Sequence, residues 1–157
     1  MLTKYAASKI LYELTGLKQS TIFDSANIYL GLSKTEPTST GGNVTEPAAT
    51  IDGESSNYFR FKLGYYSNMP SELVYMNNPT ATGGPFDYVT NKTEIHFNVA
   101  LKNWTATGEQ ITHVCLFNGN AATSKLLAYG ALTTPITAEE NTVVVIPVGG
   151  FSISIAE

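Results

Sequence analysis

The stretch that decides the fold class, residues 110–156, reads QITHVCLFNGNAATSKLLAYGALTTPITAEENTVVVIPVGGFSISIA. It contains four runs of residues with high β-propensity, and the turns between them are rich in Asn, Gly, Thr and Pro. Closely spaced strands of this kind are typical of β-sandwiches and barrels. The four predicted strands span residues 110–118, 125–132, 142–148 and 151–156.

The first of these runs, 110–118, carries apolar residues on both faces. Such a strand is predicted to be central and covered on both sides, with an N-terminal helix as one candidate cover. Pro147 has no N–H for a ladder, so the end of the run 142–148 is predicted to be an edge or a bulge. The predicted core draws on Ile111, Val114, Leu116, Phe117, Leu126, Leu127, Phe151, Ile153 and Ile155.

Upstream of this stretch, strict alternation of apolar and polar residues predicts half-buried strands at 27–34, 58–63 and 93–99. A weaker, short strand is predicted at 72–76. The side chains expected to point inward are Ile28, Leu30 and Leu32 in the first strand, Phe59, Phe61 and Leu63 in the second, and Ile95, Phe97 and Val99 in the third. Those expected to point outward are Tyr58, Arg60 and Lys62 in the second, and Glu94, His96 and Asn98 in the third.

One helix is predicted, over residues 2–15, where apolar residues recur at about 3.6-residue spacing. Thr3 can cap its N-terminus, and Gly16 stands where a glycine commonly ends a helix. The sequence therefore predicts a mainly β protein: an antiparallel β-sandwich, jelly-roll or immunoglobulin-like, with one short N-terminal α-helix. Its predicted parts are a helical arm, 1–20, and a single β-sandwich domain, 21–157, with long contact loops or mobile loops at 35–57 and 77–91.

The chain is poor in charge, which bears on its partners. Charged residues make up 14% of the 157, the net charge is −4, and Arg60 is the single arginine. No basic stripe is present, so we expect no nucleic-acid partner. The predicted helix is not basic and amphipathic, and no run approaches the roughly 18 apolar residues of a membrane span, so we expect no membrane partner. The N-terminus lacks the apolar core of a signal peptide, which predicts synthesis in a reducing cytoplasm.

Residues that could carry chemistry are few. His113 and Cys115 share a predicted strand, but no third group orients the histidine, and a buried free cysteine is most often a small hydrophobe. His96 is the second of two histidines. Asp52 and Glu54 flank Gly53 but lack the alternating acids of a calcium loop, which favours an ordinary solvated loop. The common catalytic and phosphate-binding motifs are absent from the sequence. We therefore expect no catalytic, cofactor-binding or metal-binding residue, no cofactor and no enzymatic activity.

Aromatic residues leave a second class of function open. A sugar site needs exposed aromatic rings beside amides and carboxylates, although aromatics more often serve burial and protein interfaces. The candidate rings are Tyr65, Tyr66, Tyr75, Tyr88 and Trp104. Three Asn-x-Thr sequons, at Asn43, Asn91 and Asn103, agree with surface loops.

Two segments carry a resemblance to a known family. IYLGLSKTEPTSTGG, 28–42, and THVCLFNGNAATSKLLAYGALTTPITAEENTVVVIPVGGFSISI, 112–155, resemble small virion structural proteins of tailed bacteriophages, of tail-fibre-like or head-decoration-like type. The resemblance covers both ends of the chain and leaves 64–92 unmatched. It is structural, so it implies no active-site residue.

This resemblance, the low charge and the Tyr-rich composition together favour a non-enzymatic virion structural protein. We expect it to be made in the host bacterial cytoplasm, to self-associate, and to decorate or extend the capsid or the tail. Its expected partners are other copies of itself and capsid or tail proteins of the phage. The alternative is a carbohydrate- or receptor-binding β-module on the virion surface, with a host-surface glycan as partner.

Overall fold

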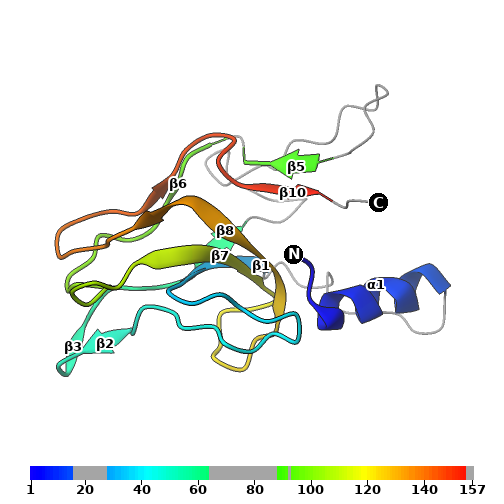
Figure 1. Ribbon diagram of the computed structural model, residues 1–157, viewed down its shortest axis with the longest axis horizontal. Helices are drawn as coiled ribbons and strands as arrows, with labels where there is room; N and C mark the ends of the chain where they lie inside the picture. The colour runs from blue at the N-terminus through cyan, green and yellow to red at the C-terminus, as the bar shows by residue number, and fades with distance from the viewer. Residues whose placement is uncertain (16–27, 64–87, 92, 155–157) are drawn as a thin grey trace.

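A four-stranded antiparallel sheet forms the centre of the computed structural model, which describes residues 1–15, 28–63, 88–91 and 93–154. The strands lie in the order β4 (Phe61–Leu63), β1 (Ile28–Ser33), β7 (Ile111–Phe117) and β8 (Leu126–Ile136) (Figure 1). One helix, α1 (Lys4–Thr15), lies at the β8 side of the sheet. The prediction of a mainly β fold with one short N-terminal helix is confirmed.

Three two-stranded antiparallel ribbons surround the sheet. They are β2 (Thr50–Ile51) with β3 (Glu54–Ser55), β6 (Ile95–His96) with β9 (Val145–Ile146), and β5 (Tyr88–Thr90) with β10 (Ser152–Ser154). A second continuous sheet is not seen in the described part of the chain, so the predicted sandwich is not confirmed. Pairing in β9 stops at Pro147, which cannot donate to a ladder and is followed by Gly149 and Gly150. The weak strand predicted at 72–76 lies outside the described residues.

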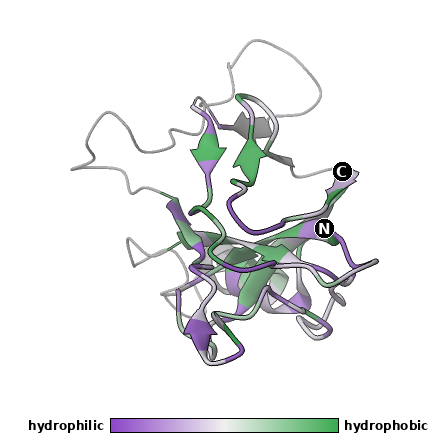
Figure 2. Ribbon diagram, turned by 90° about the vertical axis from the view of Figure 1, so that its left-hand side faces the viewer, coloured by the Kyte–Doolittle hydropathy of each residue, from purple (hydrophilic) through white to green (hydrophobic). Residues whose placement is uncertain are grey.

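The main core lies between one face of the sheet and the β6–β9 ribbon. Alternate residues of β1, Leu30 and Leu32, pack there with Ile95 and Ile146, which pair across the ribbon. In Figure 2 the strands are largely green, whereas the peripheral turns are mostly purple or white. The other buried members of this core are Tyr58, Leu63, Phe97, Ala100, Trp104, Ile111, Ala138 and Val144.

Strand β7 is covered on both faces, as its sequence predicts. Val114 and Leu116 pack against the main core, and Leu116 also contacts the cluster beneath α1. Cys115 and Phe117 belong to a separate cluster with Leu126. Of the predicted core, Ile111, Phe117, Leu126 and Leu127 are buried, and Val114, Leu116 and Phe151 are partly buried against the core. The side chains of Ile153 and Ile155 lie outside the described part.

Helix α1 begins where its cap predicts. The Thr3 hydroxyl accepts a hydrogen bond from the Ala6 N–H at 3.3 Å, which satisfies one of the free donors of the first turn. Ala6 is buried against Leu127, so the helix docks on β8 through a small residue. Gly16, the predicted terminator, lies outside the described residues.

The facing of residues 58–60 is the reverse of the prediction. Tyr58 is buried and Phe59 is 54% exposed, because β4 begins only at Phe61 and the alternation does not extend back to residue 58. The Tyr58 hydroxyl donates to Glu46 Oε1 at 2.7 Å and accepts from the Leu32 N–H at 2.9 Å. These two bonds satisfy a buried polar group, and they fix the ring inward. Val99 is likewise exposed rather than inward, and the next residue, Ala100, takes the buried position.

Residues 35–57 carry more structure than a simple loop. Asp52 and Gly53 both have positive φ, of 52° and 80°, and they join β2 to β3 in a two-residue hairpin turn. Pro37 and Ser56 are fully buried. The division into a helical arm, 1–20, and a β domain, 21–157, stays a prediction.

Candidate assembly surface

Cys115 and His113 both lie on β7, where their surroundings differ. Cys115 is fully buried, and burial raises the pKa of its thiol to about 12, so the nucleophilic thiolate is scarce at neutral pH. His113 is partly buried, and its Nδ1 lies 2.8 Å from the Thr112 hydroxyl. Its ring lies 6.4 Å from that of Tyr129. This environment does not make a nucleophile of Cys115.

The acids around Gly53 are engaged by the hairpin and a lysine. Glu54 forms a salt bridge with Lys102, and hydrogen bonding to that ammonium lowers the pKa of Glu54. Asp52 occupies the turn itself. Within the described residues, no group of three or more His, Cys, Asp or Glu is placed to hold a metal ion. The pair therefore serves the hairpin.

Trp104 is one of the candidate rings for a sugar site, and the structure places it in the core, in agreement with the usual role of aromatic residues in burial. Its side chain is buried, and its Nε1–H donates to the Ser56 carbonyl at 2.8 Å. Its ring meets that of Tyr58 edge to face at 5.3 Å between centroids. A buried indole with a satisfied N–H belongs to the core. Tyr65, Tyr66, Tyr75 and the side chain of Tyr88 lie outside the described residues.

Arg60 forms a clamp that the sequence pattern did not reveal. Its guanidinium binds both carboxylate oxygens of Glu46, with the shortest contact at 2.6 Å, and lies 3.6 Å from the Phe117 ring centroid. It also donates to the carbonyls of Gly119 and Ala121 at 3.0 and 3.2 Å. The clamp therefore joins residue 46 to the β7–β8 turn. One hint of this role was present in the sequence: Arg60, the single arginine of the chain, lies in the strand predicted at 58–63.

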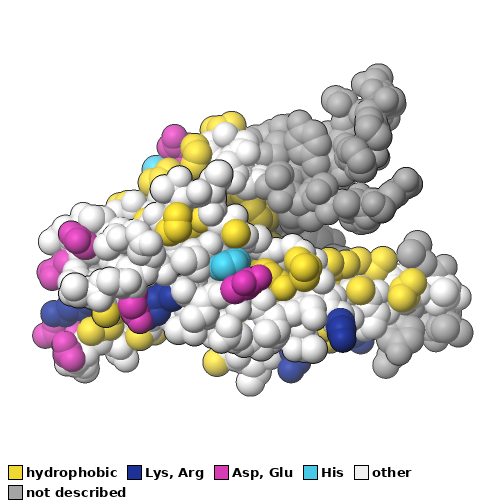
Figure 3. Space-filling model, in the orientation of Figure 1, with side chains coloured by type: hydrophobic (Ala, Val, Ile, Leu, Met, Phe, Trp, Pro, Cys, Tyr) yellow, Lys and Arg dark blue, Asp and Glu magenta, His cyan; other side chains and the backbone are white. Residues whose placement is uncertain are grey.

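The β6–β9 ribbon presents an apolar outer face. His96 pairs with Val145 across the ribbon, and both side chains are exposed on the side opposite the core. Val143, which precedes strand β9, is also exposed, and the residue between the two, Val144, is buried. Figure 3 shows hydrophobic side chains beside a histidine and an acid over this part of the molecule. The acid at this histidine is Glu94, with Oε2 2.9 Å from His96 Nε2.

Val148 follows the end of the ribbon and is another exposed apolar residue. It lies in a turn that is held by hydrogen bonds to the Asn91 side chain. The Asn91 amide donates to the Pro147 carbonyl at 2.8 Å and accepts from the Phe151 N–H at 2.9 Å. Asn91 is fully buried, so this sequon is not in a surface loop as expected. We call Val143, Val145 and Val148 the valine face; they are 40%, 36% and 61% exposed.

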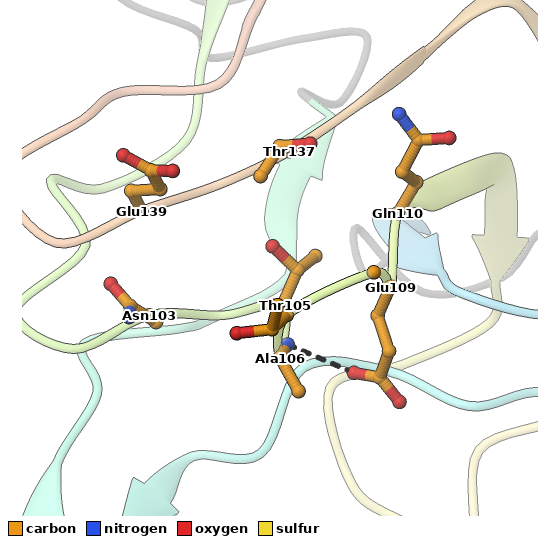
Figure 4. A pocket seen from close by; sticks show the side chains of 9 residues that line it. Asn103, Thr105, Ala106, Glu109, Gln110, Thr137 and Glu139 are labelled. Atoms are coloured by element: carbon orange, nitrogen blue, oxygen red, sulfur yellow. Dashed lines mark hydrogen bonds between the residues drawn. The ribbon is translucent and has the colours of Figure 1, made fainter.

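A polar depression of about 280 Å³ lies where the chain enters β7. Segment 103–110 forms one side, and Thr137 and Glu139, which follow β8, form the other (Figure 4). Glu109 is held at its rim by Lys34 at 2.7 Å and by the Ala106 N–H at 3.1 Å. The remaining lining offers hydroxyl, amide and carboxylate groups: Asn103, Thr105, Thr107, Gln110, Thr137 and Glu139.

The family model for podophage GP4 fiber I protein gp80, named Gp80, matches residues 1–154. No curated protein matches the chain. Among the helical residues that the structure describes, none forms a segment long and apolar enough to cross a bilayer.

Proposed function

The chain belongs to the Gp80 family of podophage fibre proteins, and from this premise we propose that it is a non-enzymatic part of the tail that self-associates and extends a fibre. Membership supports a structural role in the virion, and the match spans nearly the whole chain. The proposed partners are other copies of the chain and the neighbouring tail proteins.

The valine face is the observation that supports self-association best. Three branched apolar side chains are exposed there, and the ribbon that contains Val145 is fixed by Ile95 and Ile146 in the core. Burying an exposed valine fully is worth about 1.5–3 kcal/mol, which favours covering such residues with another protein surface. Valine also loses little side-chain freedom on burial because its χ1 is already restricted.

The test compares a lysine on the valine face with a lysine elsewhere. Val145→Lys should lower the mass measured by light scattering at assembling concentrations and reduce incorporation into phage particles. Ala122→Lys places the same charge on the exposed turn between β7 and β8. It is the matched control and should leave the measured mass and the incorporation into particles unchanged. A wild-type chain that stays monomeric at every concentration and is missing from purified particles would contradict the proposal.

A second candidate function, binding of a host-surface glycan, is favoured by the polar depression. Its volume of about 280 Å³ suits a single sugar unit better than an extended chain. Gln110 and Glu139 could hydrogen-bond sugar hydroxyls from opposite sides. Saturation-transfer NMR with host polysaccharide should show contact that Glu139→Gln weakens and Glu140→Gln, one residue outside the lining, does not. Equal transfer to both variants would count against this site.

A further inference from the structure

Residues 1–3 add a short strand to the outer edge of β8. Leu2 pairs with Ala128 in an antiparallel bridge. The Thr3 N–H donates to the Leu127 carbonyl at 2.8 Å, and the Tyr129 N–H donates to the Met1 carbonyl at 2.9 Å. This is strand addition, in which main-chain hydrogen bonds give affinity and side chains set the register.

Side chains make this docking specific. The Thr3 hydroxyl is buried, and its oxygen lies 2.7 and 3.0 Å from the carbonyl oxygens of Leu126 and Leu127. The Lys4 N–H donates to the Ser39 carbonyl at 2.8 Å, and Ala6 is buried against Leu127. Sliding the arm by one residue would place the Thr3 hydroxyl away from its acceptors. We call residues 1–15 the arm and this part of β8 its dock.

The arm reaches beyond its dock. In Figure 1, α1 leaves the edge of the sheet and projects away from it. Met1, Leu2 and Leu11 are 73%, 44% and 59% exposed, and they make up a third of the nine large hydrophobic residues found exposed in the described part. Leu11 lies on α1, and Met1 and Leu2 lie in the segment paired with β8. Exposed apolar groups along the arm favour contact with another protein surface.

The segment between the arm and β1 is long enough for the arm to reach β8 of its own chain or β8 of a neighbouring copy. It comprises the 12 residues from 16 to 27. At full extension a segment of that length spans at most about 40 Å, which exceeds the diameter of a small domain. Docking on the same chain and docking on a neighbour use the same hydrogen bonds, so their free energies differ through what the arm buries in addition and through the entropy lost when two copies associate.

We propose that the arm is exchanged: residues 1–15 of one copy dock on β8 of a neighbouring copy, with the register seen within the single chain. Exchange of an identical element is a low-cost route between protomers, because no new complementary surface is needed. This inference rests on the proposed self-association and names the contact that carries it.

Cysteine trapping tests the exchange directly. Leu2 and Ala128 form a non-hydrogen-bonded antiparallel pair, whose Cα atoms stand about 4.5 Å apart, within the range that a disulfide accepts. In a Cys115→Ser background, one chain carries Leu2→Cys and a second carries Ala128→Cys. The two are co-expressed and oxidised. Neither chain can form an internal disulfide, so a covalent heterodimer requires the arm of one copy on the dock of the other.

A control chain tests whether the disulfide is specific to the dock. Ala131→Cys, exposed on the opposite face of β8, replaces Ala128→Cys and should give little heterodimer. We expect Ala128→Cys to give at least tenfold more. Yields equal to the control, while light scattering shows assembly, would overturn the exchange and leave self-association standing. Yields equal to the control together with a monomer at all concentrations would overturn both.

A second variant guards against misfolding of the paired chains. A single chain with Leu2→Cys, Ala128→Cys and Cys115→Ser should form intermolecular disulfides when assembled, seen as a ladder on non-reducing gels. A purely internal disulfide in the assembled protein would show that the arm stays on its own chain, and would equally overturn the proposal.

Discussion

Strand β7 and the β6–β9 ribbon are both β structure, but β7 is covered on both faces and the ribbon on only one. β7 lies between β1 and β8, and apolar clusters cover it on both sides. The ribbon buries one face against the same core and leaves Val145 exposed on the other. Strands that are covered on both faces hold the fold together, whereas strands that are covered on one face remain available for contact with another protein.

The largest expected effect falls in the shared core. Trp104→Ala should lower the free energy of unfolding by about 3–5 kcal/mol, since it removes a buried ring and leaves a cavity. It also leaves the Ser56 carbonyl without its indole donor. Chemical denaturation measures the change. A loss below 1 kcal/mol would show that the ribbon and sheet do not share one core.

A smaller loss of stability is expected when one methyl group is added to β1, at Gly31. A Cβ at Gly31 would stand 2.7 Å from Glu46 Oε1 and 2.9 Å from Phe117, so Gly31→Ala should cost about 1–3 kcal/mol through overpacking. Gly130→Ala on β8 is the matched control, because nothing lies within 4 Å of its added Cβ. Its stability should be unchanged or slightly higher. Equal midpoints for the two variants would contradict the tight packing around Glu46.

The covered face of β7 should also respond to alkaline pH. Burial raises the pKa of Cys115 from 9.0 to about 12, so the folded state holds this proton more tightly than the unfolded state. The contribution is fully present below pH 9 and is lost as pH rises toward 12. Cys115→Ala should therefore flatten the fall of unfolding free energy over that window. Parallel curves for the variant and the wild type would indicate that solvent reaches the thiol.

The smallest effect on stability should come from the outer face of the ribbon. Val145→Thr keeps the branched shape and should change the unfolding free energy by less than about 0.5 kcal/mol, as is usual for surface positions. The same change should weaken self-association, measured by light scattering. Leu32→Thr, at a fully buried position, provides the contrast and should destabilise the fold strongly. If Val145→Thr destabilised as much as Leu32→Thr, the two regions would not differ as described.

Much of the fold was predictable from local patterns. The alternation in residues 27–34 predicted β1, and the apolar residues on both faces of 110–118 predicted a central strand. The capping role of Thr3 was visible for the same reason, since these features depend on neighbours in sequence. The hairpin at Asp52–Gly53 was missed although it had a signal, a two-residue Asp-Gly turn between short β-prone runs. The resemblance at both chain ends likewise indicated a phage structural protein, which the family match supports.

The sequence by itself indicated the strands of the central sheet, the start of the helix and a resemblance to phage structural proteins, but β2, β3 and β5 lie in segments predicted to be loops. At positions where simple alternation fails, only the tertiary structure decided which side chains are buried. Tyr58 turns inward because residues 32 and 46 supply its hydrogen-bond partners, and Trp104 is buried because residue 56 accepts its N–H. Likewise, residues 1–3 join β8, more than a hundred positions away. Alternation defines two faces of a strand, but long-range packing and hydrogen bonding choose the one that meets the core, the solvent or another copy of the chain.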